Sequence, residues 1–216
     1  MIRAVIFDMD GVLIDSEIVY IRHQCEKLQK KYPWVTQESL YPTVGMSGAE
    51  DRLFLAKLLR RDIDDPAFLQ ELEELYRSCE VSYPDILNPQ AADVLKRLRK
   101  MGLQIALASS SGMETIRHVL HTCGIAQYFD SVVSGDQFRR SKPDPEIYQC
   151  TMQRLGRQPD ECLVIEDSTY GVRAGAAAGA IVVALRDDRF PFDQSAALFQ
   201  IECLEDIFQL VTATGE

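Results

Sequence analysis

The 216-residue sequence lacks the features of several classes of protein. No apolar run approaches the roughly 20 residues that a membrane-spanning helix needs. The first three residues run directly into an apolar segment, so we expect no signal peptide. The six cysteines are scattered and form no C-x-x-C pair, which is typical of reduced thiols, and we therefore expect a cytoplasmic protein. No internal repeat or low-complexity segment is visible.

Basic residues are also in the minority, with 23 against 33 acidic residues and a formal net charge of -10. This balance argues against a nucleic acid or a membrane as partner. A small anionic substrate is compatible with the charge, because a bound metal ion can reverse the local field. Hydrophobic residues make up 46% of the chain, enough for the core of one large domain or of a domain with an insert. We expect the protein to be a monomer.

The most informative stretch lies near the start, where an apolar run ends in two carboxylates. Residues 5–7 are typical of a strand buried on both faces. Asp8 and Asp10 follow, and residues two apart in an extended chain share a face. Gly11 then permits a tight turn. Ligands bind at the carboxyl ends of strands in parallel sheets, so this is a candidate site. A simple strand end with an Asp-Gly turn and a helix cap explains the motif equally well.

The stretch from residue 16 to about 83 shows only helical spacing of its apolar residues and no strand pattern. Helix signals include a capping-box pattern at 47–50 and an Asp65 cap followed by Pro66. Because an apolar strand precedes this block, we expect it to be a cap domain inserted into an α/β core.

The rest of the chain alternates strands with helices, which predicts a parallel sheet joined by right-handed crossovers. The later strands are expected at 104–108, 131–134, 162–165 and 181–185. The helices are expected at 89–101, 145–155, 170–178 and 204–211, with another ending at 123. The predicted fold class is α/β: a Rossmann-like parallel sheet core with helices on both faces and an inserted all-helical cap domain. The expected domain bounds are 1–14 and 86–216 for the core and 15–85 for the cap.

Three further polar clusters follow predicted strands. They are Ser109-Ser110-Ser111, Lys142 within the segment SKPDP, and Glu166-Asp167. Taken singly, each has an ordinary explanation, because serines cap helices, such proline-rich segments form exposed turns, and acidic residues balance a helix dipole. Together with the first motif, they would bring polar groups from four strand–helix junctions to one edge of the sheet. That combination favours a functional site.

Four motifs carry a resemblance to a known family: FDMDGVLIDSE, ALASSS, SKPDPEIY and IEDSTYGVRAGAAAG. With them the chain resembles the haloacid dehalogenase superfamily of phosphatases, and within it the β-phosphoglucomutase-like branch with a helical cap. The resemblance extends to about residue 185. It implies a phosphoric monoester hydrolase that acts on a small phosphorylated metabolite, such as a sugar or polyol phosphate.

The residue types suit phosphoryl transfer. With an ordinary pKa of about 4, a carboxylate such as Asp8 is ionised at neutral pH and can attack phosphorus without a base, forming an aspartyl-phosphate. Asp10 can protonate the leaving alkoxide and later accept a proton from water. The resemblance implies that Ser109 and Lys142 hold the non-bridging phosphoryl oxygens.

The charge of this site implies a metal ion. Four carboxylates and a phosphate monoester would meet, while Lys142 supplies only one positive charge. Mg²⁺ is the usual oxygen-ligated cation with phosphates. The resemblance implies that Asp8 and Asp167 ligate through their side chains and Asp10 through its backbone carbonyl, with Glu166 in or beside this ligand set.

The resemblance implies that the cap determines substrate specificity, and in the cap the sequence departs from the mutases. Tyr20 stands where the mutases have a histidine, and His23 lies three residues further on. The turn GMSGA lacks the arginine with which they grip a second phosphate, and Arg52 is displaced along the helix. The substrate-binding candidates are Ser110, Ser111, Tyr20, Gly45, Ser47 and Arg52. We therefore favour a phosphatase over a β-phosphoglucomutase-type transferase, and both over a non-catalytic binding protein on this fold, because all the acidic groups for catalysis are present.

Overall fold

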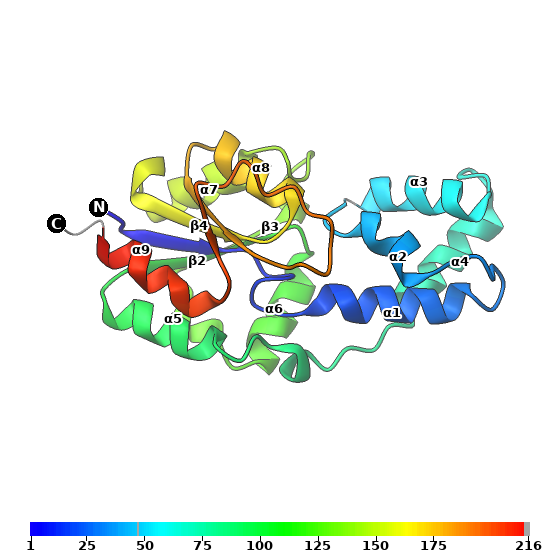
Figure 1. Cartoon of the computed structure of the whole chain (residues 1–216), viewed down its shortest axis with the longest axis horizontal. Helices are drawn as coiled ribbons and strands as arrows, with labels where there is room; N and C mark the ends of the chain where they lie inside the picture. The colour runs from blue at the N-terminus through cyan, green and yellow to red at the C-terminus, as the bar shows by residue number, and fades with distance from the viewer. Residues whose placement is uncertain (47, 214–216) are drawn as a thin grey trace. The chain divides into compact units, whose positions relative to one another are not determined.

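The computed structural model describes residues 1–46 and 48–213 (Figure 1). The chain divides into two compact units, one formed by Met1–Asp15 with Tyr83–Glu216 and the other by Ser16–Ser82. The first unit contains the sheet and the helices that cover it, and the second unit is helical. All the acidic candidates and Lys142 belong to the first unit.

The first unit is built on a six-stranded sheet with the order β3-β2-β1-β4-β5-β6, in which all neighbouring strands are parallel. The strands are β1 (Ala4–Phe7), β2 (Gln104–Ser109), β3 (Ser131–Ser134), β4 (Cys162–Glu166), β5 (Ile181–Leu185) and β6 (Phe199–Ile201). At the end of β1, Phe7 pairs with Leu107 on one side and Ile165 on the other. This register aligns the carboxyl ends of the three central strands, so the residues that follow them meet at one edge.

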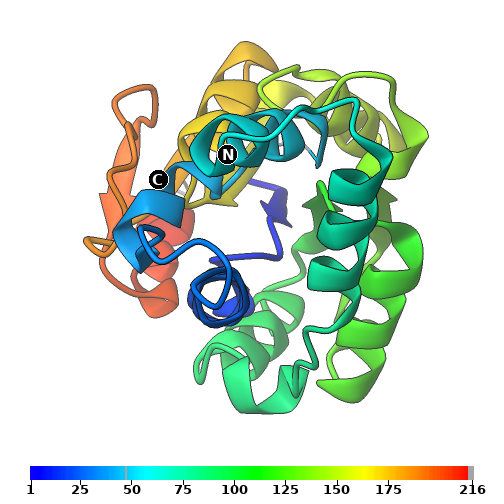
Figure 2. The ribbon, with the colours of Figure 1, turned by 90° about the vertical axis from the view of Figure 1, so that its right-hand side faces the viewer.

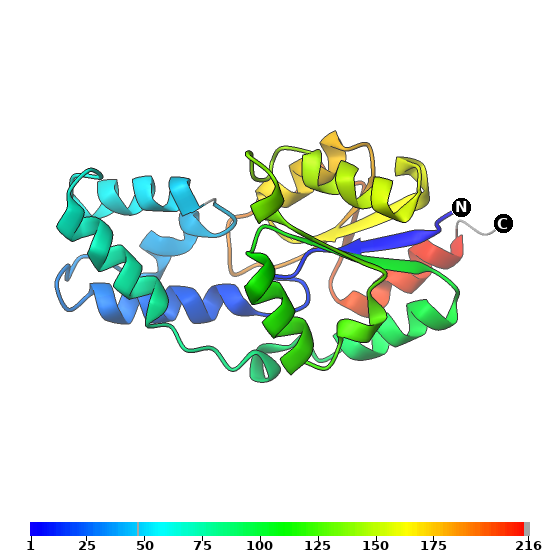
Figure 3. The same cartoon turned by 180° about the vertical axis from the view of Figure 1, so that it is seen from behind.

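Helices cover both faces of this sheet, as Figures 1 and 3 show. One face carries α5 (Ala91–Lys100), α6 (Met113–Thr122) and α9 (Ile207–Ala213), and the other carries α7 (Glu146–Leu155) and α8 (Thr169–Ala177). Alternate residues of β1 contribute to the two cores, with Val5 and Phe7 on the first face and Ala4 and Ile6 on the second. Because β1 is buried on both faces, its sequence is an uninterrupted apolar run. The α/β prediction is confirmed.

The second unit contains α1 (Ser16–Leu28), α2 (Gln37–Leu40), α3 (Gly48–Leu59) and α4 (Pro66–Arg77), and Figure 2 shows α1 end-on. Among its described residues none lies in a strand. Asp65 caps α4, since its side chain accepts a hydrogen bond of 2.9 Å from the backbone N–H of Ala67. The role of this unit as a cap stays a prediction. Among residues 1–46 and 48–213, no helix has the combined length and apolar character that crossing a membrane requires.

The element bounds differ from the predicted ones in a few places. Helix α5 begins at Ala91, because Asn88 Oδ1 first accepts a hydrogen bond of 3.0 Å from Gln90 N in a turn. Strand β6 was not predicted. Short 3₁₀ turns lie at Tyr41–Thr43, Tyr83–Ile86, Ala126–Tyr128, Gly135–Gln137, Pro159–Glu161 and Leu204–Asp206.

Candidate active site

Asp8 is the first residue after β1 and is buried at the carboxyl edge of the sheet. Its backbone N–H donates a 3.0 Å hydrogen bond to Ile165 O, which continues the pairing with β4. The chain then turns at Gly11, which has a φ of +77°. A Cβ atom at Gly11 would lie 2.0 Å from Asp167 Oδ2, so glycine is required here for two reasons. The turn thereby brings the first motif against the acidic pair at the end of β4.

Lys142 enters the same site from the segment after β3. Its ammonium group donates three hydrogen bonds, to Asp8 Oδ1 at 2.6 Å, to Glu166 Oε1 at 2.6 Å and to Ala108 O at 3.0 Å. These bonds use all three of its protons. Burial alone lowers the pKa of Lys142, but the charges of Asp8 and Glu166 raise it well above its ordinary value. Since the side chain is only 5% exposed, an exposed turn does not explain the position of Lys142, although Ser141 and Pro143 are exposed.

Glu166 is the last residue of β4 and is fully buried. Its Oε1 atom accepts hydrogen bonds from Lys142 Nζ and from the Tyr148 hydroxyl, the latter at 2.5 Å. Its Oε2 atom accepts from Asp167 N at 3.2 Å and from Ser168 Oγ at 3.3 Å. Four donors therefore surround this carboxylate, enough to satisfy a buried anion.

Carboxylate oxygens from Asp8, Glu166 and Asp167 lie within 4.8 Å of one another, and all three residues are buried. With Lys142 they form a cluster of three potential negative charges and one positive charge. Hard divalent cations such as Mg²⁺ prefer such oxygen donors, so this donor set fits the expected ion. This cluster could therefore hold a divalent metal ion, although Asp10 is not among its three members.

The environment of Asp8 corrects one expectation from the sequence. Burial, opposed by Lys142 and reinforced by the charges of Glu166 and Asp10, raises the pKa of the Asp8 carboxyl to about 8 without a metal ion. Without a metal ion, the Asp8 carboxyl is therefore not fully ionised at neutral pH, whereas an exposed aspartate would be. The prediction used the ordinary pKa of an exposed carboxylate, and it was wrong because the side chain is desolvated beside other acidic groups.

Three serines lie where β2 ends, and Ser111 contacts the first motif. Ser111 Oγ donates a 2.9 Å hydrogen bond to Asp10 Oδ2, and Ser109 Oγ accepts one of 3.0 Å from Ser111 N. Ser109 is fully buried, while Ser110 is exposed. Helix α6 has Gly112 at its N-cap position, so helix capping does not explain these serines. The structure therefore brings Asp10 and Ser111 together.

The remaining candidates lie in the helical unit. Tyr20 is half-buried on α1, Gly45 has a φ of +77°, and Arg52 is exposed on α3. Ser47 lies outside the described residues. His23 forms a 2.9 Å hydrogen bond between its Nε2 atom and Ser78 Oγ. The parts of these residues in substrate binding stay predictions.

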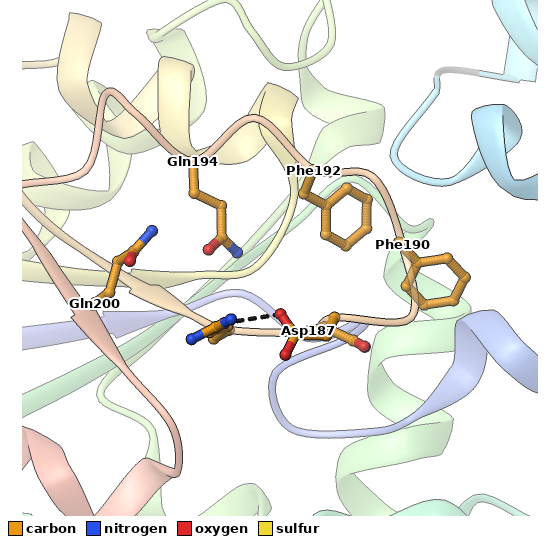
Figure 4. Close-up of a pocket in the computed structure, with 7 residues that line it drawn as sticks. Asp187, Phe190, Phe192, Gln194 and Gln200 are labelled. Carbon is orange, nitrogen blue, oxygen red and sulfur yellow. Dashed lines mark hydrogen bonds and ion pairs between the residues drawn. The ribbon is translucent and has the colours of Figure 1, made fainter.

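A cavity of about 380 Å³ lies where the chain leaves β5 (Figure 4). It is lined by Arg186, Asp187, Asp188, Phe190, Phe192, Gln194 and Gln200. Gln194 is buried, and its Nε2 atom donates hydrogen bonds to Asp167 O at 2.5 Å and to Leu185 O at 2.9 Å. Gln194, which lines the cavity, thus holds the backbone of Asp167, a candidate metal ligand. This contact could not be predicted from the sequence, because Gln194 lies in the stretch without a predicted element.

Comparison with known proteins establishes the family. Haloacid dehalogenase-like hydrolases match residues 2–179, and the chain belongs to this family. The expected class of enzyme, a hydrolase of the phosphatase type in the β-phosphoglucomutase-like branch, agrees with that match and with the relatives that follow.

Two curated relatives have phosphatase names. The "Phosphorylated carbohydrates phosphatase" of Thermotoga maritima is 32% identical over 82% of this chain and 82% of its own. The "Fructose-1-phosphate phosphatase YqaB" of Escherichia coli is 30% identical over 84% of this chain and 95% of its own. Among solved structures, β-phosphoglucomutase from Clostridium difficile has the same fold, with a TM-score of 0.82 at 20% identity over 99% of this chain and 96% of its own.

Proposed function

We propose that this protein is a Mg²⁺-dependent phosphatase that hydrolyses a sugar or polyol phosphate through an aspartyl-phosphate on Asp8. The observation that carries the proposal is the buried cluster of Asp8, Lys142, Glu166 and Asp167 at the end of the central strand. The names of the two phosphatase relatives support the choice of a phosphorylated carbohydrate as substrate.

In the first half-reaction, a carboxylate oxygen of Asp8 forms a bond to phosphorus while the bond from phosphorus to the substrate oxygen breaks. That oxygen leaves with the bonding electron pair and takes a proton from the carboxyl group of Asp10. The Ser111 hydroxyl, bonded to Asp10 Oδ2, orients this group. Lys142 shifts a hydrogen bond to a phosphoryl oxygen and stabilises its charge, as Ser109 does.

In the second half-reaction, water attacks the phosphorus of the aspartyl-phosphate. Asp10, now ionised, accepts a proton from this water as the new bond to phosphorus forms. The bond between phosphorus and Asp8 breaks, which regenerates the Asp8 carboxylate and releases inorganic phosphate. One water is consumed for each ester bond, and the alcohol and phosphate are the products.

The metal ligands in this proposal are the side chains of Asp8 and Asp167 and the backbone carbonyl of Asp10. When bound, Mg²⁺ supplies positive charge that favours the ionised form of Asp8 and offsets the charge of the phosphoryl group. Glu166 already accepts four hydrogen bonds, so we assign it to holding Lys142 beside these ligands.

A mutase would need a second phosphate site in the cap. One candidate cation is Arg52, whose Nη1 atom lies 3.8 Å from the position that a Cβ atom of Gly48 would take. Arg52 therefore lies close to the start of α3, where the mutases have their arginine by resemblance. Because of this proximity, mutase activity is the second candidate function. Phosphatase activity is the first, because the arginine and the histidine of the mutases are absent from their usual positions.

The proposal is tested by measuring phosphate release from a panel of phosphorylated metabolites with Mg²⁺, with excess chelator and with the Asp8→Asn variant. We expect at least one sugar or polyol phosphate to be hydrolysed without a bisphosphate activator, and the chelator and the variant each to abolish release. Hydrolysis that persists in chelator would reject the metal requirement. Hydrolysis that persists in the variant would reject the role of Asp8.

A further inference from the structure

Tyr148 lies in the first turn of α7 and contacts both partners of the buried ion pair. It is fully buried. Its hydroxyl donates to Glu166 Oε1 at 2.5 Å, and its ring centroid lies 4.9 Å from Lys142 Nζ. Burial and the charge of Glu166 raise the pKa of the Tyr148 phenol well above its ordinary value, so it stays a proton donor throughout the neutral range. A tyrosine that only filled the core would not need its hydroxyl at this position.

The same oxygen of Glu166 accepts from Lys142 and from Tyr148. Lys142 has no spare proton, since its three donors bond to Asp8, Glu166 and Ala108. To bind a phosphoryl oxygen it must release or share one of these bonds. If the released bond is the one to Glu166, the Tyr148 hydroxyl remains to satisfy Oε1 and to hold the carboxylate in place.

Helix α8 also confines Glu166. A Cβ atom at Gly171, in the first turn of α8, would lie 1.9 Å from the Glu166 carboxyl group. The backbone of α8 therefore approaches the carboxylate closely, while Tyr148 bonds to it from α7. Glu166 has little freedom to rotate as long as both helices hold it.

We propose that Tyr148 is a positioning residue whose hydroxyl fixes Glu166 so that Lys142 stays beside Asp8 and can turn toward a phosphoryl group. The proposal rests on the phosphatase function proposed above. It assigns Tyr148 no contact with substrate. Its effect passes through Glu166 to Lys142.

The test compares Tyr148→Phe with Thr151→Val, which is a matched control on the same helix. Phenylalanine keeps the ring beside Lys142 and removes only the hydroxyl. Thr151 is also fully buried, but its hydroxyl donates to Ile147 O at 2.7 Å within α7, so valine removes a buried hydroxyl away from Glu166. Binding of inorganic phosphate to each Mg²⁺-loaded protein is measured by isothermal titration calorimetry, and urea unfolding is measured in parallel.

We expect Tyr148→Phe to raise the Kd for phosphate about tenfold, the effect of one hydrogen bond to a charged group, and to lower kcat/KM at least as much. Thr151→Val should leave both values near those of the unmodified protein, even if the two variants lose similar stability. Equal phosphate affinity in Tyr148→Phe and Thr151→Val would overturn the proposal. If Tyr148→Phe does not fold, Gly171→Ala displaces the Glu166 carboxylate through α8, and unchanged phosphate affinity in that variant would overturn the proposal too.

The two proposals fail in different ways. If the unmodified protein neither binds phosphate with Mg²⁺ nor hydrolyses any phosphate ester, the phosphatase function is wrong. If it does both and Tyr148→Phe behaves like Thr151→Val, only the role of Tyr148 is wrong.

Discussion

The ammonium group of Lys142 lies 2.6 Å from Asp8 Oδ1, and both side chains are buried at the carboxyl end of the central strand. The two residues are 134 positions apart in the sequence. The Glu166 carboxylate, also 2.6 Å from this ammonium group, stabilises the charge of the buried lysine, and Asp8 becomes its second anionic partner when it ionises. This pair is the centre of the proposed reaction, and the predictions below begin with its acidic member.

Replacing Asp8 by asparagine keeps the shape of the side chain and removes the attacking charge. We expect kcat to fall by at least about 10³-fold, as for loss of a covalent nucleophile. The measurement is phosphate release from the best substrate of the panel. A kcat within about tenfold of the unmodified enzyme would show that another group attacks phosphorus.

Replacing Asp10 by asparagine should have an effect that depends on the leaving group. An alkoxide needs a proton to leave, whereas an aryl oxide needs it much less. We expect the variant to lose far more activity on a sugar phosphate than on p-nitrophenyl phosphate. Ser111→Ala, which removes the hydroxyl bonded to Asp10 Oδ2, should show the same trend with a smaller loss. Equal losses on both substrates would contradict the role of Asp10 as general acid.

Asp8 should contribute a loss of stability to the metal-free protein as the pH rises from about 4 to about 8. The pKa of Asp8 is raised to about 8 in the folded state, mainly by burial, against 3.8 ordinarily. In this window Asp8 keeps a proton in the folded state that it releases in the unfolded state, so its contribution to the free energy of unfolding decreases with pH. Urea unfolding in chelator at several pH values measures this decrease.

The Asp8→Asn variant is the control for this titration, because asparagine carries no proton that can be lost. Its stability should change less with pH than that of the unmodified protein, and near pH 8 it should be the more stable of the two. Added Mg²⁺ should reduce the difference, because the ion favours the ionised carboxylate. Parallel pH profiles for the two metal-free proteins would show that Asp8 titrates at its ordinary pKa.

Much of the fold could be predicted from local sequence. The strands β1 to β5 were predicted to within one residue, because buried parallel strands are short apolar runs bounded by turn residues. Strand β6 could not be predicted because it lacks this pattern. It has three residues, and Phe199 and Gln200 are exposed, so it shows neither an apolar run nor a clear alternation.

The candidate site could be predicted only in part. Parallel strands place their following residues at one edge, which led to Asp8, Lys142 and Glu166, and the structure brings these three together. Tyr148 lies in the motif SKPDPEIY, but its hydrogen bond to Glu166 depends on how α7 packs against the sheet. The raised pKa of Asp8 could likewise not be predicted from the sequence, because burial and neighbouring charges are properties of the folded chain. The catalytic roles themselves stay predictions.

The most direct test of the proposed function follows a sugar phosphate by phosphorus NMR, which separates substrate, isomerised sugar phosphate and inorganic phosphate in one reaction. β-Glucose 1-phosphate with Mg²⁺ is the informative substrate, because a mutase converts it to glucose 6-phosphate and a phosphatase releases phosphate. Without the arginine in its usual position in the cap, a second phosphate loses a contact of roughly 1.5–3 kcal/mol. We predict that inorganic phosphate appears faster than glucose 6-phosphate and that Asp8→Asn produces neither. Accumulation of glucose 6-phosphate well ahead of inorganic phosphate would contradict the phosphatase assignment and would point to Arg52 or His23 as the missing cap residue.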